Sequence, residues 1–192
     1  MKCLEVGDLV FIKRNNFFYK KIAETTNSWT SHVAIVYKKE GRDILLAESC
    51  FPFSKLSTFD DYIARSEDGV VCVKRLQDAL NDEQKLAVKL AADKRIKKFY
   101  TWGYNYESKY QFCSKFVAEI YQEALAVTIG EQETFQDILD NSSSCSKSFW
   151  TKIFLGKLPL QRKTMTPYSI YVSDLLETLY DNFPSKGRFE EV

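Results

Sequence analysis

Histidine is nearly absent from this chain, which has a single one, His32, among 192 residues. Any chemistry that needs an imidazole must therefore use His32, because no second histidine exists to replace it. The five cysteines are widely spaced and contain no CxxC pair, which argues against a zinc site. Their odd number favours free thiols in a reducing compartment. We expect neither a metal nor another cofactor.

An excess of charge of one sign is also missing, since 27 basic residues face 26 acidic ones for a net charge of +1. Without a long basic run, nucleic acid is not the expected partner. The longest apolar runs are far short of a membrane span, so we expect no integral membrane segment. The N-terminus has no apolar stretch typical of a secretory signal, and we expect a cytoplasmic protein. Export that needs no N-terminal signal stays open.

Apolar residues, by contrast, are abundant, at 45% of the chain with 14 Phe and 11 Tyr. This is enough to bury a sizeable core, and it argues against wholesale disorder. The length suits one domain, which we expect to span residues 1–192 with a mobile tail over about 184–192. The sequence does not indicate an oligomeric state.

Hydrophobic periodicity predicts an α+β protein. Strands are expected over residues 9–12, 33–37, 44–49 and 70–73. The second and third are nearly continuous in apolar residues, so both faces of the sheet should be covered. They are joined by a charged, Gly-containing connection typical of a hairpin. Weaker patterns indicate short helices over residues 56–65 and 173–180.

Two stronger helices are predicted, over residues 82–98 and 112–125. Asn81 or Asp82 caps the first of them. Its buried side is marked by Leu86, Leu90 and Ile96. In the second helix, one face gathers the apolar side chains of Phe112, Phe116, Val117, Ile120, Tyr121 and Ala124.

His32 and Glu48 stand in the two strands of the expected hairpin. In an antiparallel pair the position numbers of opposed residues add to a constant, and these two face each other if the turn centres on Glu40. A carboxylate there would hold the imidazole in one tautomer and stabilise its charged form. A slip of one residue would place them on opposite faces.

Cys113 lies in the first turn of the predicted helix over residues 112–125. Free N–H groups at a helix start favour a thiolate, as a nearby imidazolium would, and they can stabilise an oxyanion. We therefore predict that Cys113 is the reactive thiol. Cys50 is the rival because it lies near Glu48, but no helix start supports it.

Each of these residues also has a purely structural interpretation. A histidine at a strand edge is usually structural or exposed, a glutamate at a strand end is usually solvated, and a cysteine on an apolar helix face is usually a small buried hydrophobe. The expected opposition of His32 and Glu48 favours the catalytic interpretation.

At these residues the chain resembles a known family. GDLVF at residues 7–11 and SHVAIV at residues 31–36 are similar to the GDLVF…HVGI pattern of the NlpC-type papain-fold cysteine peptidases. YTWG at residues 100–103 and FCSKFV at residues 112–117 resemble the segment around that family's nucleophile. In the ordinary family, however, the cysteine helix precedes the histidine strand, and here it follows.

The order histidine, glutamate, cysteine is similar to the circularly permuted branch, the YiiX/YebB-like hydrolases. The similarity runs along most of the chain and includes AES at residues 47–49 and KTMTP at residues 163–167. The resemblance implies a circularly permuted papain-like fold, with the cysteine helix packed on an antiparallel sheet. It implies the nucleophile at Cys113, the base at His32 and the orienting acid at Glu48.

The resemblance also assigns Tyr100 to the border of the active site near the oxyanion. The loop aromatics Trp29, Trp102, Tyr104 and Tyr106 are candidates to line the cleft, although aromatic residues in loops more often serve packing. It implies a cysteine peptidase or amidase that cleaves a small peptide or amino-acid-linked substrate. No export signal or wall-binding domain accompanies the core, which argues against peptidoglycan. Acyl transfer or lipid deacylation by the same triad stays open, as does a catalytically silent binding module.

Overall fold

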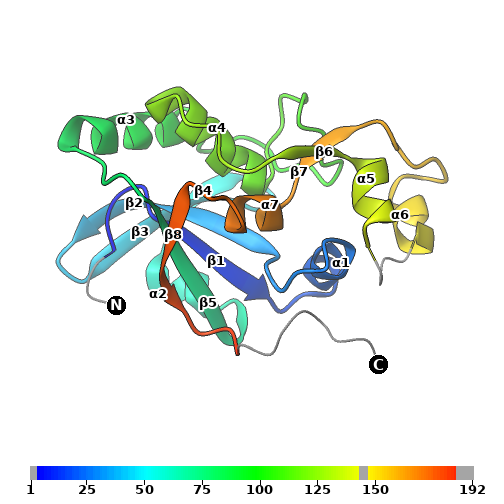
Figure 1. Cartoon of the computed structure of the whole chain (residues 1–192), viewed down its shortest axis with the longest axis horizontal. Coiled ribbons are helices and arrows are strands. Elements are labelled where there is room, and N and C mark those ends of the chain that lie inside the picture. The colour runs from blue at the N-terminus through cyan, green and yellow to red at the C-terminus, as the bar shows by residue number, and fades with distance from the viewer. Residues whose placement is uncertain (1–3, 143–146, 185–192) are drawn as a thin grey trace.

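The computed structural model describes residues 4–142 and 147–184. Its centre is an antiparallel sheet of six strands (Figure 1). In spatial order these are β4 (Ser54–Thr58), β3 (Asp43–Ser49), β2 (His32–Glu40), β1 (Leu9–Arg14), β5 (Ser66–Leu76) and β8 (Leu176–Asp181). A separate pair contains β6 (Gln132–Thr134) and β7 (Lys163–Met165). The α+β prediction is confirmed.

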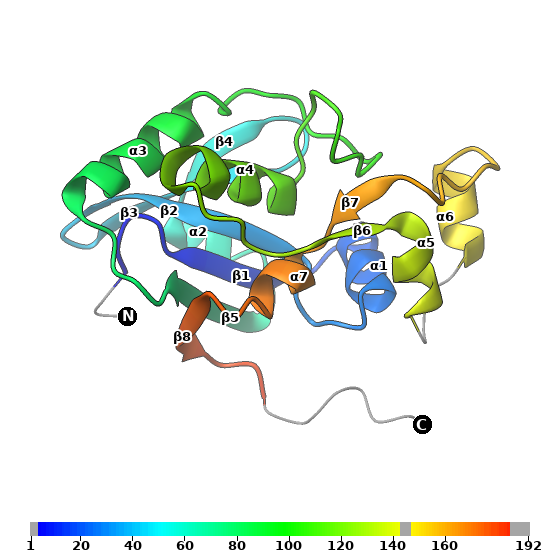
Figure 2. The ribbon, with the colours of Figure 1, turned by 45° about the horizontal axis from the view of Figure 1, so that its top comes forward.

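The helices lie on both sides of this sheet. They are α1 (Phe17–Thr25), α2 (Phe59–Ile63), α3 (Asp82–Asp93), α4 (Cys113–Leu125), α5 (Phe135–Asp140), α6 (Lys147–Ile153) and α7 (Pro167–Tyr171). Helices α3 and α4 cover one face and α2 lies against the other, while α1, α5 and α6 gather beyond one end of the strands (Figures 1 and 2). None of the helices in the described residues is long and apolar enough to cross a membrane.

Successive side chains of the central strands point to opposite faces of the sheet, and this divides the core into two clusters. Phe11 and Val33 point to the α4 side, where they pack with Phe116. Their neighbours Ile12 and Ala34 point to the α2 side. Both faces of the sheet are therefore covered, as the continuous apolar strands predict.

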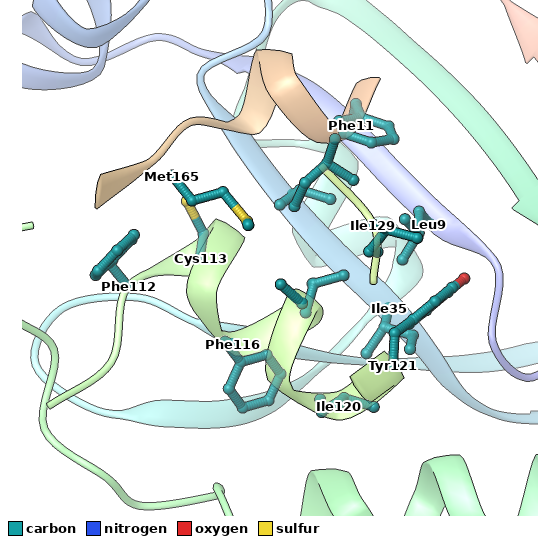
Figure 3. Packing of buried hydrophobic residues seen from close by; sticks show 14 of the residues in the cluster. Leu9, Phe11, Ile35, Phe112, Cys113, Phe116, Ile120, Tyr121, Ile129 and Met165 are labelled. Carbon is teal, nitrogen blue, oxygen red and sulfur yellow. The ribbon is translucent and has the colours of Figure 1, made fainter. Parts of the chain in front are cut away.

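Helix α4 is the main packing element on the first face. Its predicted apolar face is buried, and Figure 3 shows Phe116, Ile120 and Tyr121 directed into the core from successive turns. The Tyr121 hydroxyl donates a hydrogen bond to the carbonyl of Gly7, which ties the helix to the start of β1. The helix begins at Cys113, and no side chain caps its first turn.

Helix α3 departs from its prediction in length and in orientation. It begins after an Asn81 capping box, as expected, but ends at Asp93. The predicted buried side is wrong, because Leu86 and Leu90 are 55% and 53% exposed. Its buried side chains are Val88, Ala91 and Ala92. Small residues on this side let the helix lie close against α4.

Two predicted helices contain strands instead. Residues 54–58 pair with β3 as an edge strand, and only then does Thr58 cap the short helix α2. Leu176–Asp181 pairs with β5. In both places the open edge of a neighbouring strand offers backbone hydrogen bonds that local helix preference does not outweigh. The predicted tail lies almost wholly outside the described residues.

Candidate active site

His32 and Glu48 form a fully buried pair across β2 and β3. The Nε2 atom of His32 lies 2.7 Å from Oε2 of Glu48, and both side chains are inaccessible to solvent. The prediction that they lie on neighbouring antiparallel strands with their side chains together is confirmed. The prediction that His32 and Glu48 are directly opposed is wrong. Ile35 pairs with Ala47, so the numbers of paired positions add to 82 rather than 80. The register differs by two residues, which preserves the shared face.

Glu48 accepts further hydrogen bonds that sequence reasoning missed. Ser57 in β4 donates to Oε1 at 2.6 Å. Arg65, which follows α2, donates to Oε1 at 2.6 Å and to Oε2 at 3.2 Å. No motif marks either residue in the sequence, because their positions depend on β4 being a strand. Together they fix both oxygens of the carboxylate that contacts His32.

The charge states of this pair follow from burial and from Arg65. Burial would raise the pKa of Glu48, but hydrogen bonds and charge from His32 and Arg65 outweigh it and hold the pKa well below its usual range. Burial lowers the pKa of His32 to about 4, against the opposing effect of Glu48. Near neutral pH the imidazole is therefore neutral and Glu48 is ionised.

An ionised Glu48 accepts the Nε2 proton, which selects one tautomer of His32. The Nδ1 atom then carries the free lone pair, and it is buried without a hydrogen-bond partner among the described residues. The ring lies 5.5 Å from that of Tyr19 and 5.6 Å from that of Tyr62, measured between centroids. Because Tyr19 belongs to the first core cluster and Tyr62 to the second, His32 stands where the two clusters meet at the strand end.

Cys113 is buried at the first position of α4, with Met165 beside it (Figure 3). Its sulfur is within reach of the backbone N–H groups of Val33, which follows His32, and of Ser114. These donors lower the pKa of the thiol, but burial outweighs them and raises it to about 11. Burial therefore opposes the thiolate that these backbone donors favour. Helix α4 therefore places the Cys113 sulfur next to Val33, the residue that follows His32. No hydrogen bond joins this sulfur to the imidazole of His32.

The predicted aromatic residues divide between two places. Tyr100 is buried, and its ring lies 4.9 Å from that of Trp102. Trp102 in turn lies near Tyr19, whose ring lies against His32, so a chain of ring contacts connects Tyr100 to the His32–Glu48 pair. Trp29 packs on Tyr171 and Phe183, and it lines a larger cleft that shares Thr25 and Thr26 with the small pocket beside Cys113.

Tyr104, one of the candidate cleft residues, lines the same small pocket as Cys113. Its backbone has a φ of +44°, a conformation that is strained for a bulky side chain. Its hydroxyl is buried and lies within hydrogen-bonding reach of the Tyr100 hydroxyl. Backbone strain costs free energy, and here it falls on a residue near Cys113.

The rival cysteine, Cys50, lies directly after β3 and is 3% exposed. Burial raises the pKa of its thiol, and the negative charge of Glu48 raises it further. No helix begins at Cys50, so it lacks the backbone donors that Cys113 has.

Similar proteins are found among curated sequences and solved structures. The chain is 24% identical over 180 residues to the uncharacterized protein YiiX of Escherichia coli K12, covering 94% of this chain and 88% of the relative. A crystal structure of YiiX from Escherichia coli O157:H7, described as a metalloprotein, matches with a TM-score of 0.83 and 22% identity. That match covers 94% of this chain and 98% of the other, and it shows that the two share a fold.

The side chains in the described part of the chain do not fit a metal centre of several ligands. Within residues 4–142 and 147–184, no three His, Cys, Asp or Glu side chains gather in a way that holds a metal ion. At the His32–Glu48 pair, both carboxylate oxygens accept hydrogen bonds from Arg65, whose fixed positive charge opposes a cation.

Residues 3–180 match the permuted papain-like amidase family YaeF/YiiX, C92. This match spans nearly all of the described chain and agrees with the antiparallel sheet on which α4 packs. The chain therefore belongs to the C92 family of permuted papain-like amidases and is a hydrolase of the papain-like kind.

Proposed function

We propose that this hydrolase cleaves an amide bond, peptide or amino-acid-linked, with Cys113 as nucleophile, His32 as general base and Glu48 as the acid that orients it. The observation that supports this most directly is the buried pair of His32 and Glu48, whose ring leaves Nδ1 unpaired. The thiol of Cys113, at an uncapped helix start, lies within reach of the N–H of Val33, the residue that follows His32. A basic nitrogen without a partner and a thiol are the parts that thiol catalysis needs.

In the first step, Nδ1 of His32 takes the thiol proton as the sulfur of Cys113 attacks the substrate carbonyl carbon. The resulting oxyanion is stabilised by backbone N–H groups at the start of α4, that of Cys113 among them, with Tyr100 as a second donor. His32 then passes the proton to the leaving amine as the C–N bond breaks, which leaves a thioester on Cys113. Water, activated by His32, hydrolyses the thioester and regenerates the thiol.

The resting site is a neutral thiol beside a neutral imidazole, because burial lowers the pKa of His32 and raises that of Cys113. Charge therefore develops during attack and not before substrate binds. The ionised Glu48 is already in place to stabilise the imidazolium that forms, which is electrostatic preorganisation. Arg65 and Ser57 keep that carboxylate from reorienting.

The three cysteines in the described residues, Cys50, Cys72 and Cys113, are free. A thiol mechanism requires this of Cys113. The same observation supports a reducing, cytoplasmic setting as part of the proposal.

The test is to trap the thioester. The purified protein is mixed with activated amides and esters, and its intact mass is measured within the first turnover. A mass increase of one acyl group, mapped to Cys113 and absent from Cys113→Ala, is expected. The matched control is Cys50→Ala, which removes a buried thiol outside the site and should acylate normally. Acylation that persists in Cys113→Ala would exclude this nucleophile, and no acylation with any substrate would favour a silent binding module.

A further inference from the structure

Aromatic side chains are exposed along the edge of the sheet that β4 forms. They are Phe51, Phe53, Phe99 and Tyr110, at 63%, 41%, 58% and 42% exposure. The first two precede β4, and the others belong to the connection between α3 and α4, which runs beside β4 (Figure 2). Phe53 forms a β-bridge with Phe99, and their ring centroids lie 4.7 Å apart. The rings therefore gather on one surface, which we call the aromatic edge.

The backbone fixes the direction of these rings. Gln111 donates a backbone hydrogen bond to the carbonyl of Phe99 and forms a bridge with Tyr100. Successive side chains of such extended segments point to opposite sides. Tyr100 and Gln111 are buried. Their neighbours Phe99 and Tyr110 therefore face solvent, with 6.4 Å between their ring centroids.

The size of the aromatic edge limits what can cover it. An aromatic side chain has an area of about 200 Å², so these four together expose roughly 400 Å². Patches of this size on soluble proteins are often functional. Two copies of the chain that met through it would bury about 800 Å² in total, less than the roughly 1,200 Å² of a stable interface. A second copy is therefore not the favoured occupant.

Positive charge surrounds the rings. The exposed lysines in these segments are Lys55, Lys97, Lys98 and Lys109. Residues 51–56, 97–101 and 109–111 contain no acidic side chain, and Glu107 lies just outside them. The ion pairs that lysines form within the described part of the chain all involve other lysines. The aromatic edge therefore suits a partner that carries negative charge.

Lysine rather than arginine supplies this charge, which favours lipid over protein. Protein interfaces are enriched in arginine and depleted in lysine. Arg95, the nearest arginine along the chain, is paired with Glu119 and Glu123. Proteins that bind the surface of anionic membranes combine aromatic rings with lysines. Lys109 lies over the ring of Tyr110, with 5.5 Å from its ammonium to the ring centroid, so a charge and an amphipathic ring reach the surface together.

We propose that the aromatic edge and its lysines dock this protein on an anionic lipid surface. The phenylalanine rings enter the boundary between headgroups and acyl chains, and the ammonium groups contact the negative headgroups. The inference goes beyond the proposed function and does not depend on it. The ring of Phe51 lies 5.8 Å from that of Trp102, which ring contacts connect to His32 through Tyr19. Docking therefore holds the candidate active site close to the lipid.

The test uses the purified whole protein and vesicles of two compositions, phosphatidylcholine alone and phosphatidylcholine with about 30% phosphatidylserine. Sedimentation of the vesicles measures the bound fraction, which gives the partition coefficient. One lysine near an anionic surface contributes about fivefold to binding, so four should favour the anionic vesicles by about 100-fold or more. Binding should weaken as salt is added, because salt screens the charges.

Phe99→Ser and Phe17→Ser are a matched pair. Phe17 is 67% exposed, and its ring contacts that of Phe149 much as Phe99 contacts Phe53, but it lies on α1, outside the aromatic edge. Phe99→Ser should weaken binding to anionic vesicles about tenfold, because the burial of one ring is lost. Phe17→Ser should leave binding unchanged. The melting temperature of each variant shows whether it is folded.

Lys98→Gln and Lys39→Gln remove the same charge from two places. Lys39 is exposed in β2 near the turn to β3, outside the aromatic edge. Lys98→Gln should weaken binding to anionic vesicles about fivefold, whereas Lys39→Gln should not weaken it. Equal losses in the two variants would show that only the net charge of the protein matters, and would overturn the assignment of this surface.

Two further outcomes would also overturn the proposal. One is equal binding to neutral and anionic vesicles. The other is no binding to either, which would direct attention to an acidic protein as the partner of the aromatic edge. Cys113→Ala should bind vesicles as the unmodified protein does. The vesicle result therefore stands or falls separately from the proposed hydrolysis.

Discussion

Glu48 meets His32 diagonally, and a one-residue bulge between Val36 and Lys38 makes the contact possible. Near the turn, Glu40 pairs with Asp43, and this register continued along the strands would place Glu48 opposite Ile35, on the other face from His32. The extra residue shifts the pairing by one and restores the shared face. The contact between Glu48 and His32 therefore depends on a bulge in β2.

Cys113 and His32 should each be nearly indispensable for turnover. Cys113→Ala should lower turnover by about 10⁴-fold or more, because no other group forms the acyl-enzyme. His32→Ala should cost nearly as much, since the chain has no other histidine. Groups that act as a unit are not additive, so the double variant should be little worse than either single one. Steady-state rates on an activated ester measure this, and a His32→Ala variant that keeps most of its activity would contradict the mechanism.

Arg65 is expected to act as a positioning residue through Glu48. Its positive charge lowers the pKa of both Glu48 and His32, so Arg65→Gln should move the acid limb of the pH profile of kcat/KM to higher pH. Arg75→Gln is the control, because Arg75 binds Asp8, outside the candidate site. A purely structural role of Arg65 would lower the rate without shifting the limb.

Acid should destabilise the protein in a defined window. The pKa of His32 is 6.5 when unfolded and about 4 when folded, so the unfolded state binds the extra proton between these values. Stability is full above pH 6.5 and falls by about 3 kcal/mol as the pH drops to 4. Below pH 4.5, protonation of Glu48 adds to the loss. Urea midpoints across this range measure it, and His32→Gln, in a chain with no other histidine, should remove the part between pH 6.5 and 4.

The sequence predicts the parts of the site that follow from local pattern. The helix that carries the candidate nucleophile can be predicted from the period of its apolar residues. Side chains alternate between the two faces of a strand, so an error of two residues in the predicted register still places His32 and Glu48 on the same face. The extent to which a side chain is buried cannot be read from the local pattern in the same way. The start of α4 favours a thiolate at Cys113, but burial in the surrounding core raises the pKa of the thiol more than the helix N–H groups lower it.

Contacts that depend on the tertiary arrangement could not be predicted. Arg65 and Ser57 reach Glu48 only because residues 54–58 form an edge strand, where the local pattern indicates a helix. The same holds for residues 176–181, which pair with β5 at the far edge of the sheet. Edge strands are short and partly exposed, so their sequences carry little of the apolar alternation that identifies central strands.

The order of elements along the chain divides the proposed catalytic group into two pieces. Base and acid come from β2 and β3, the thiol comes from α4, and residues 77–81 connect the two parts between β5 and α3. A chain cut in this connection yields one fragment with an acid–base pair but no nucleophile, and another with a nucleophile but no base. Neither fragment alone has a complete mechanism, whereas in the whole protein β5 of the first piece pairs with β8 of the second. Hydrolysis by such a split protein would report the association of its halves.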